Sequence, residues 1–290
     1  MTRLILERVQ VRHGRSTLVD EVSATVGEDH GPGAGELFGL IGPNGAGKSS
    51  LLRAIAQLLP YQGTIHLDGV ALGSLTPRQR ATRLAYLAQG DHAVWPLTVR
   101  DFVALGRFPH RARWRGTASD DDAVSGAIRH MGLETLQHRR LDQLSGGERA
   151  RARLARALAV EAPLLLADEP VASLDPFHQL SVMELLRAQC ELGRTVVVVL
   201  HDLTLASRFC DRVLLLEHGR TVACGTTRKV LTAANLQRVY QVQAMLGEHE
   251  QQRYVLPWRC RPEPTSSSPT TPPPGQPAPA ARLTRLAPIE

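Results

Sequence analysis

The chain contains four short apolar runs, and each is followed by polar residues or glycines. They cover residues 37–41, 84–88, 164–167 and 195–200. Uninterrupted apolar runs of this length are typical of strands that a parallel sheet buries on both faces. Because helical patterns separate most of them, the sequence predicts an α/β fold with a mostly parallel sheet.

Weaker patterns predict the remaining elements. Alternating residues predict strands over 3–12 and 18–26, and a third strand enters a turn at 64–69. Residues 212–217 and 220–223, joined by His218-Gly219, predict a closing hairpin. Helices are predicted over residues 50–59, 76–82, 100–105, 120–131, 147–160, 179–192 and 232–240.

Composition shifts twice along the chain. Residues 90–160 are charged and predicted to be mostly helical. From Pro257 onward the chain holds ten of its 19 prolines, so residues 257–290 are expected to form a disordered or extended tail.

An arginine cluster lies within the charged region. It consists of Arg107, Arg111, Arg113 and Arg115. Clustered surface charges are often no more than a solvated face of a helix, and a docking surface is the alternative. The pattern alone leaves both open.

The overall composition narrows the class of protein. Hydrophobic residues make up 43% of the 290 residues, which suffices for a sizeable core, although aromatic residues make up only 4%. The net charge of +6 permits an anionic partner without selecting one. The four cysteines are scattered without C-x-x-C spacing, which disfavours both metal binding and a disulfide framework and fits a reducing cytosol. No apolar run approaches the roughly 18–20 residues of a membrane span, and the N-terminus is not a secretory signal.

The strongest motif is a glycine-rich loop that follows the first apolar run. Residues Gly42-Pro43-Asn44-Gly45-Ala46-Gly47-Lys48-Ser49 read G-x-x-x-x-G-K-S, and Ser50 continues into a predicted helix. Glycines let backbone N–H groups wrap around phosphates, and the helix N-terminus adds partial positive charge. Lys48 is expected to reach the β- and γ-phosphates, and the Ser49 hydroxyl to bind Mg²⁺.

Polar residues end the other predicted parallel strands. They are Gln89, Asp168 with Glu169, and His201. Ligands of such sheets bind beyond the carboxyl ends of the strands. Asp168 is suited to hold Mg²⁺, Glu169 to polarise an attacking water, and His201 to donate to the γ-phosphate. Gln89 is suited to contact the metal or the water. Each residue alone has a structural explanation, but their joint order favours phosphoryl transfer.

The segment Leu144-Ser145-Gly146-Gly147-Glu148 has two interpretations. Ser145 and Glu148 have the spacing of a capping box, which fully explains a helix start. The alternative is a second phosphate-binding helix N-terminus, whose small residues expose backbone N–H groups.

Together these motifs resemble the nucleotide-binding subunit of ABC transporters, over about residues 2–245. The Walker A loop is Gly42–Ser49, the Q-loop glutamine is Gln89 and the signature is Leu144–Glu148. Walker B ends at Asp168, Ser173-Leu174-Asp175 matches the D-loop, and His201 matches the switch histidine.

The resemblance implies a P-loop NTPase fold: a RecA-like core, an N-terminal antiparallel β subdomain, and a helical signature subdomain inserted at about residues 90–160. It also implies that ATP and Mg²⁺ are bound, and that Glu169 is the catalytic base assisted by His201 and Gln89. Two copies close head to tail, so that Ser145, Gly146, Gly147 and Asp175 act in trans.

A finer resemblance concerns the branch that imports iron–siderophore complexes, haem and cobalamin. It rests on residues 95–99, 105–110 and 175–180. It implies a homodimer on an integral membrane permease dimer, at the cytoplasmic face of the bacterial inner membrane, with a periplasmic binding protein as an indirect partner. A soluble ABC ATPase that acts on nucleic acid or ribosomes is the rival, and a single nucleotide domain without a long coiled coil argues against it. A regulatory protein that binds ATP without hydrolysis is disfavoured by Glu169 and His201.

Three features depart from the family pattern. His13 occupies the position of the aromatic residue, most often Tyr, that stacks on adenine. Residues 28–33 lengthen the loop before the Walker A strand, as an expected surface excursion. The proline-rich tail is not a family feature.

Overall fold

The computed structural model describes residues 2–27, 34–90, 96–111 and 117–260. All predicted site residues lie within these ranges. The loop extension at 28–33, residues 261–290 of the predicted tail, Trp95, Arg113 and Arg115 lie outside the described residues. No helix in this described part is long and apolar enough to cross a membrane.

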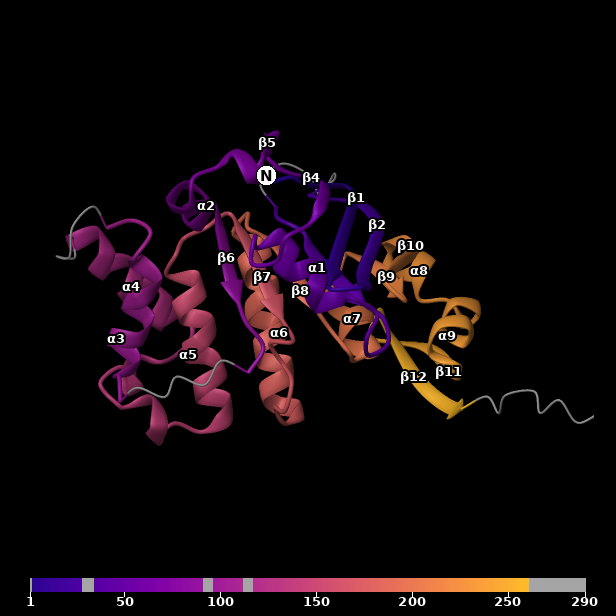
Figure 1. Cartoon of the computed structure of the whole chain (residues 1–290). Coiled ribbons are helices and arrows are strands. Elements are labelled where there is room, and N and C mark those ends of the chain that lie inside the picture. The colour runs from indigo at the N-terminus through magenta and orange to yellow at the C-terminus, as the bar shows by residue number, and fades with distance from the viewer. Residues whose placement is uncertain (1, 28–33, 91–95, 112–116, 261–290) are drawn as a thin grey trace, which may run out of the picture. The chain divides into compact units, whose positions relative to one another are not determined.

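An antiparallel sheet opens the fold, with strand order β2-β1-β4-β5 (Figure 1). Its strands are β1 (Leu4–His13), β2 (Ser16–Val26), β4 (Gln62–Leu67) and β5 (Val70–Ala71). The alternating sequence patterns predicted the first three. The N-terminal antiparallel subdomain is therefore confirmed.

The second sheet has the order β10-β9-β3-β8-β7-β6. Its strands are β3 (Leu37–Ile41), β6 (Leu84–Leu87), β7 (Leu164–Asp168), β8 (Thr195–Val199), β9 (Arg212–Glu217) and β10 (Arg220–Thr226). All neighbouring pairs are parallel except the hairpin of β9 and β10. The predicted mostly parallel sheet and its closing hairpin are confirmed.

The helices follow the predicted order. They are α1 (Lys48–Ile55), α2 (Pro77–Arg83), α3 (Val99–Ala104), α4 (Ala118–His130), α5 (Gly146–Leu158), α6 (Pro176–Glu191), α7 (Leu203–Phe209), α8 (Thr227–Val230) and α9 (Ala233–Tyr240), with short 3₁₀ turns at Leu72–Ser74, Leu105–Arg107, Glu134–Leu136 and Leu141–Gln143. Helix α1 ends before residue 59 because Gln57 takes a left-handed conformation with φ of 61°. The sequence did not predict α7 or α8.

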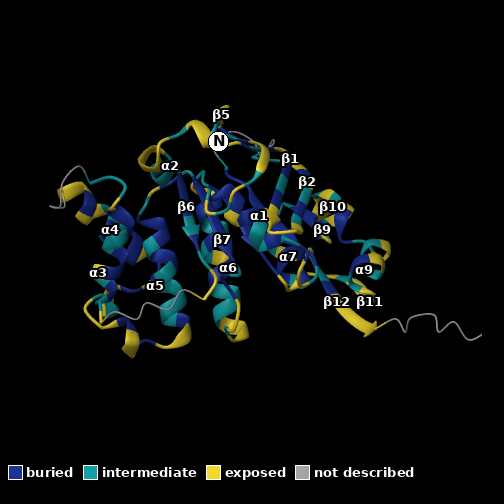
Figure 2. Cartoon of the chain, in the orientation of Figure 1, coloured by how far each residue is buried: buried dark blue, intermediate teal, exposed yellow. Residues whose placement is uncertain are grey.

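Both faces of the parallel sheet are covered. In β8, Val196 and Val198 join one hydrophobic cluster with residues of α3 to α6, whereas Val197 and Val199 join another with α1 and the antiparallel sheet. Figure 2 shows the resulting band of buried residues along the strands. This burial on both sides explains why the parallel strands are uninterrupted apolar runs.

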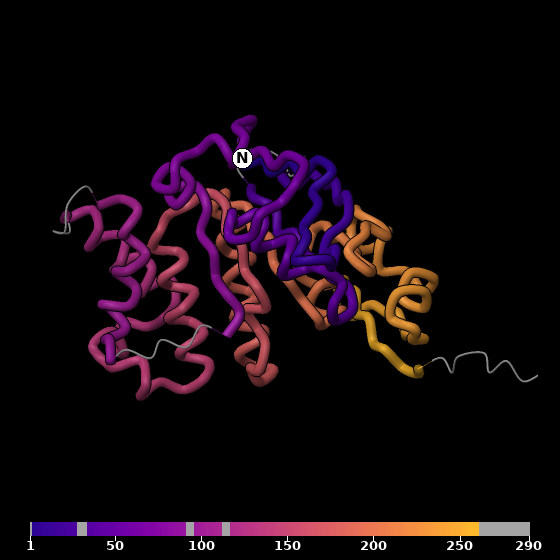
Figure 3. The backbone as a smooth tube through the Cα atoms, in the orientation of Figure 1, coloured from indigo at the N-terminus to yellow at the C-terminus, as the bar shows by residue number. Residues whose placement is uncertain are grey.

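Helices α3, α4 and α5 form the segment between β6 and β7 (Figure 3). Their inner faces contribute Phe102, Val124, Ile128 and Leu154 to the first cluster. Thr98, Thr117 and Ser145 cap the three helices by accepting backbone N–H bonds. The capping box predicted at Ser145 is present.

The chain continues past α9 into a hairpin of β11 (Val242–His249) and β12 (Gln252–Cys260). Residues 257–260, which the composition assigns to the tail, form the end of β12. Strand pairing with β11 overrides their proline content, because Pro257 lies opposite Ala244 next to a register shift.

The arginine cluster is only partly a surface feature. Arg107 is 4% exposed and binds Asp120 at 2.9 Å, Glu161 at 2.7 Å and the Ala159 carbonyl oxygen at 2.8 Å. Neither a solvated face nor a docking surface describes this residue. Its guanidinium instead ties the end of α5 to the start of α4.

We expect Asp120→Asn to lower the free energy of unfolding by about 3 kcal/mol at pH 7, because it leaves the buried Arg107 with less compensation. The Thr117 backbone N–H and the Arg107 guanidinium lower the pKa of Asp120 from 3.8 to about 2. A lowered folded-state pKa stabilises the fold above pH 3.8, and this stabilisation is lost as the pH falls toward 2. In urea unfolding, the difference from wild type should therefore shrink over that range.

The neighbouring Asp121→Asn is the control. Asp121 pairs with Arg100, but its side chain is 77% exposed, so its loss should cost less than about 1 kcal/mol. Equal effects of the two variants would contradict the buried-pair interpretation.

Candidate active site

The strand order brings the predicted polar residues to one edge. Strands β3, β8, β7 and β6 are consecutive neighbours and parallel, so their carboxyl ends lie together. The glycine-rich loop, His201, Asp168 with Glu169, and Gln89 follow these strands in that order.

Close backbone contacts fix the glycine-rich loop between β3 and α1. A side chain on Gly47, where φ is 93°, would place its Cβ 2.3 Å from the Leu18 carbonyl oxygen. A side chain on Gly42, where φ is 147°, would meet the Leu216 carbonyl oxygen at 2.2 Å. Only glycine fits both positions. The Gly219 N–H supports the loop from β9–β10 by donating to the Ala46 carbonyl oxygen at 3.1 Å.

Lys48 curls its ammonium group back onto the loop. Its Nζ donates to the carbonyl oxygens of Gly42 at 2.8 Å and Pro43 at 2.9 Å. The residue is 4% exposed. Burial lowers the pKa of Lys48, and the nearby carboxylates of Glu169 and Asp168 oppose that shift. Two of its three N–H donors are used, which leaves one to aim at a bound anion.

Ser49 and Asp168 form an oxygen pair suited to Mg²⁺. The Ser49 hydroxyl donates to Asp168 Oδ1 at 2.7 Å, and Asp168 is fully buried. Hydroxyl and carboxylate oxygens are the hard donors that Mg²⁺ prefers. Among the described residues, no cluster of three or more His, Cys, Asp or Glu suited to a metal occurs.

Glu169 contacts both Gln89 and His201, and the three side chains form a polar triad. Its Oε2 accepts from Gln89 Nε2 at 2.6 Å, and its Oε1 lies 2.6 Å from His201 Nε2. Its backbone is left-handed, with φ of 50°. Such strain in a residue other than glycine is typical of functional sites, where the surrounding structure maintains it.

A cavity of about 210 Å³ joins the loop to this triad. Its lining consists of Leu18, Asn44, Gly45, Ala46, Gly47, Lys48, Ser49, Ser50, Glu169 and His201. Four other residues contact the lining without forming part of it. The carbonyl oxygens of Gly42 and Pro43 accept from Lys48. Gln89 donates to Glu169, and Asp168 accepts from Ser49.

His13 does not line the cavity that these residues form. It is exposed at the end of β1, opposite Ser16. Leu18 on β2 lines the cavity instead. The sequence carried no signal for Leu18, because its role depends on how β2 packs against Gly47.

The signature segment forms a separate surface. Ser145 caps α5, and Asp175 caps α6 by accepting from the His178 N–H at 3.0 Å. A Cβ on Gly147 would lie 2.4 Å from the His178 ring, whereas one on Gly146 would meet no atom within 4 Å. None of Ser145, Gly146, Gly147 and Asp175 is among the described residues that line the cavity.

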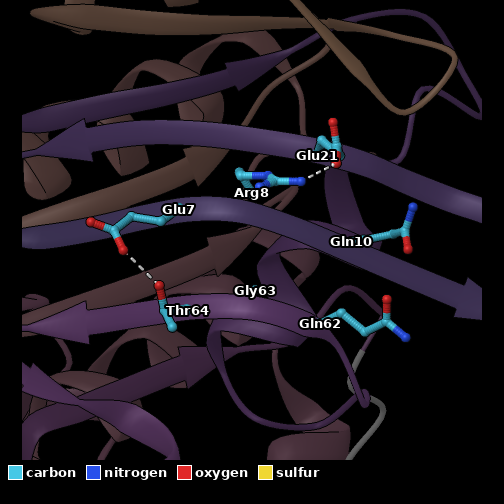
Figure 4. Close-up of a pocket in the computed structure, with 7 residues that line it drawn as sticks. All are labelled: Glu7, Arg8, Gln10, Glu21, Gln62, Gly63 and Thr64. Atoms are coloured by element: carbon cyan, nitrogen blue, oxygen red, sulfur yellow. Dashed lines mark hydrogen bonds and ion pairs between the residues drawn. The ribbon is translucent and has the colours of Figure 1, made fainter.

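A second hollow, of about 330 Å³, lies on the antiparallel sheet (Figure 4). It is lined by Glu7, Arg8, Gln10, Glu21, Gln62, Gly63 and Thr64. Its charged groups already have partners within the hollow: Arg8 binds Glu21 at 2.9 Å, and the Thr64 hydroxyl donates to Glu7 at 2.7 Å. We assign it no ligand.

Known proteins resemble both the sequence and the fold. The ABC transporter family model matches residues 32–172. The hemin import ATP-binding protein HmuV of Pseudomonas fluorescens (strain Pf0-1) is 39% identical over 86% of this chain and 96% of that protein. The ferric enterobactin transport ATP-binding protein FepC of Escherichia coli K12 is 35% identical over 85% of this chain and 90% of that protein.

A solved structure of the dimeric ATP-binding cassette MJ0796, in a post-hydrolysis state with ADP and Pi, is 28% identical with a TM-score of 0.66. The match covers 78% of this chain and 99% of that one. The chain therefore belongs to the ABC transporter family of ATP-binding proteins.

Proposed function

We propose that this protein is the ATP-hydrolysing subunit of a bacterial ABC importer for an iron chelate, either haem or a ferric siderophore, or for cobalamin. One observation carries the hydrolytic part of the proposal. Lys48, the Ser49–Asp168 pair and the Gln89–Glu169–His201 triad all serve one cavity.

Each group then has one task. The free N–H of Lys48 binds the β- and γ-phosphates of ATP. Glu169 accepts a hydrogen bond from the attacking water and orients it in line. His201 donates to the γ-phosphate, so its present bond to Glu169 is exchanged on substrate binding.

Ser49, Asp168 and Gln89 are the proposed residues of the Mg²⁺ site. Gln89 Nε2 donates to Glu169, which leaves its Oε1 as the atom available to the metal. When bound, Mg²⁺ neutralises charge on the β- and γ-phosphate oxygens.

The second half of the site comes from another copy. Ser145, Gly146, Gly147 and Asp175 are proposed to contact the ATP of the partner in trans. Two findings support this division: these residues do not line the described cavity, and Gly146 has open space around its Cα.

The names of two relatives support an importer role, and the remaining partners are proposed on that basis. HmuV is named for hemin import and FepC for ferric enterobactin transport. We place this chain at the cytoplasmic face of the inner membrane, on a permease dimer fed by a periplasmic binding protein, with no role in nucleic-acid binding. To test the assignment, the protein is reconstituted with candidate importer permeases from the same organism. ATPase stimulation by one cargo-loaded binding protein is the expected result, and failure to co-purify with any permease would contradict the assignment.

Substitution of the signature glycines should change protein stability and ATPase activity independently. Gly146→Ala should leave the free energy of unfolding unchanged or raise it by about 0.5 kcal/mol, because alanine favours helix and meets no atom. Its ATPase rate should nevertheless fall at least about tenfold, because the methyl group lies where the partner's ATP is proposed to bind. Urea unfolding and a coupled ATPase assay measure the two effects.

Gly147→Ala is the matched variant. Its methyl group must displace the His178 ring, so a stability loss of about 1 kcal/mol is expected. Full ATPase activity of Gly146→Ala would remove Gly146 from the trans contact.

A further inference from the structure

We infer that Tyr86 is a positioning residue for the magnesium site: its hydroxyl holds the Asp168 carboxylate so that one oxygen faces Ser49. The inference rests on the proposed function, and it concerns a residue that the sequence motifs do not include.

The two oxygens of Asp168 have different partners. Oδ1 accepts the Ser49 hydroxyl at 2.7 Å. Oδ2 accepts the Tyr86 hydroxyl at 3.3 Å, and Arg53 Nη2 lies 3.8 Å from the same oxygen. Three side chains from two elements thus converge on one buried carboxylate, because Arg53 and Ser49 lie one turn apart on α1 and Tyr86 lies on β6.

The fold fixes Tyr86 in this place. Strand β6 pairs with β7 in parallel, with Tyr86 opposite Leu166, two residues before Asp168. The Tyr86 ring packs against the hydrophobic cluster that contains Leu51 and Leu166. Strand pairing and ring packing therefore hold the Tyr86 hydroxyl next to Asp168 Oδ2.

Occupying Oδ2 restricts the carboxylate. A carboxylate bound at one oxygen only can rotate about its Cβ–Cγ bond and can offer either oxygen to a metal. The hydrogen bond from Tyr86 and the nearby charge of Arg53 hold Oδ2 in place. Oδ1 therefore stays directed at Ser49. Partners of this kind orient metal ligands, and their loss typically lowers metal affinity by roughly 10- to 100-fold.

Tyr86→Phe tests the inference, with Tyr61→Phe as the matched control. Both tyrosines are half-buried against the same hydrophobic cluster, but the Tyr61 hydroxyl accepts from Gln57 at 2.9 Å instead of contacting an acid. Calorimetry measures the affinity for a non-hydrolysable ATP analogue without metal and over a Mg²⁺ titration. Unfolding curves establish that both variants are folded.

The Mg²⁺ concentration for half-maximal effect should rise at least about tenfold in Tyr86→Phe. It should stay at the wild-type value in Tyr61→Phe, and metal-free affinity should be unchanged in both variants. An unshifted Mg²⁺ dependence in Tyr86→Phe, or a loss of metal-free affinity, would overturn the inference. If the wild-type chain failed to bind ATP at all, the proposed function would fall and the inference with it.

Discussion

Glu169→Gln should bind ATP with wild-type affinity and lose steady-state turnover by roughly 10²- to 10⁴-fold. The substitution preserves the size of the side chain. It removes the negative charge that we propose orients the attacking water, and it replaces one acceptor oxygen by an NH₂ donor. Glu169 is also the point where Gln89 and His201 meet, at 2.6 Å from each. Calorimetry gives the affinity, and a phosphate-release assay gives the rate.

Glu7→Gln is the control for this experiment. Glu7 lies on the antiparallel sheet and accepts from Thr64 at 2.7 Å, a bond that a glutamine oxygen can also accept. Its turnover should match wild type. Normal turnover in Glu169→Gln would exclude Glu169 as the base, whatever the control shows.

Lys48→Ala should weaken nucleotide binding by roughly ten- to a hundredfold, which is the usual range for a charge-assisted hydrogen bond. Lys48 and Lys229 are the two lysines of a chain whose other basic residues are arginines and histidines. An ammonium is a compact charge, and the Lys48 ammonium fits between two carbonyl oxygens where a planar guanidinium would not. Lys48→Arg should therefore also bind weakly.

The second lysine provides the control. Lys229 is exposed on α8, and Lys229→Ala should bind nucleotide as wild type does. Equal affinity of wild type and Lys48→Ala, measured by calorimetry, would refute the phosphate-loop assignment.

The predictable parts of the fold are those with strong local patterns. Strands β3, β7 and β8 are buried on both faces, so their apolar runs are unambiguous. Helix α7 is only seven residues long, which is too short for a clear sequence pattern. It is held in place by contacts with β12, such as the bond from Thr204 Oγ1 to the Val255 carbonyl oxygen. The hairpin of β11 and β12 keeps Met245 and Trp258 exposed, so it lacks the pattern of a buried strand.

The residues of the site also divide into those that the sequence predicts and those that only the structure reveals. Residues after strand ends could be predicted, because parallel strands share one carboxyl edge. Tyr86 could not, since it lies inside an apolar strand and contacts Asp168 only through the register of β6 and β7. Arg107 was predicted at the surface because its partner Asp120 is 13 residues away and the packing of α4 brings them together.

We propose that this cavity is half of an ATP site that a second copy completes. Light scattering of Glu169→Gln, with and without saturating Mg-ATP, tests it most directly. We expect the mass of one chain without nucleotide and of two chains with ATP. Adding Lys48→Ala should abolish this change. A single-chain mass with ATP bound would contradict it.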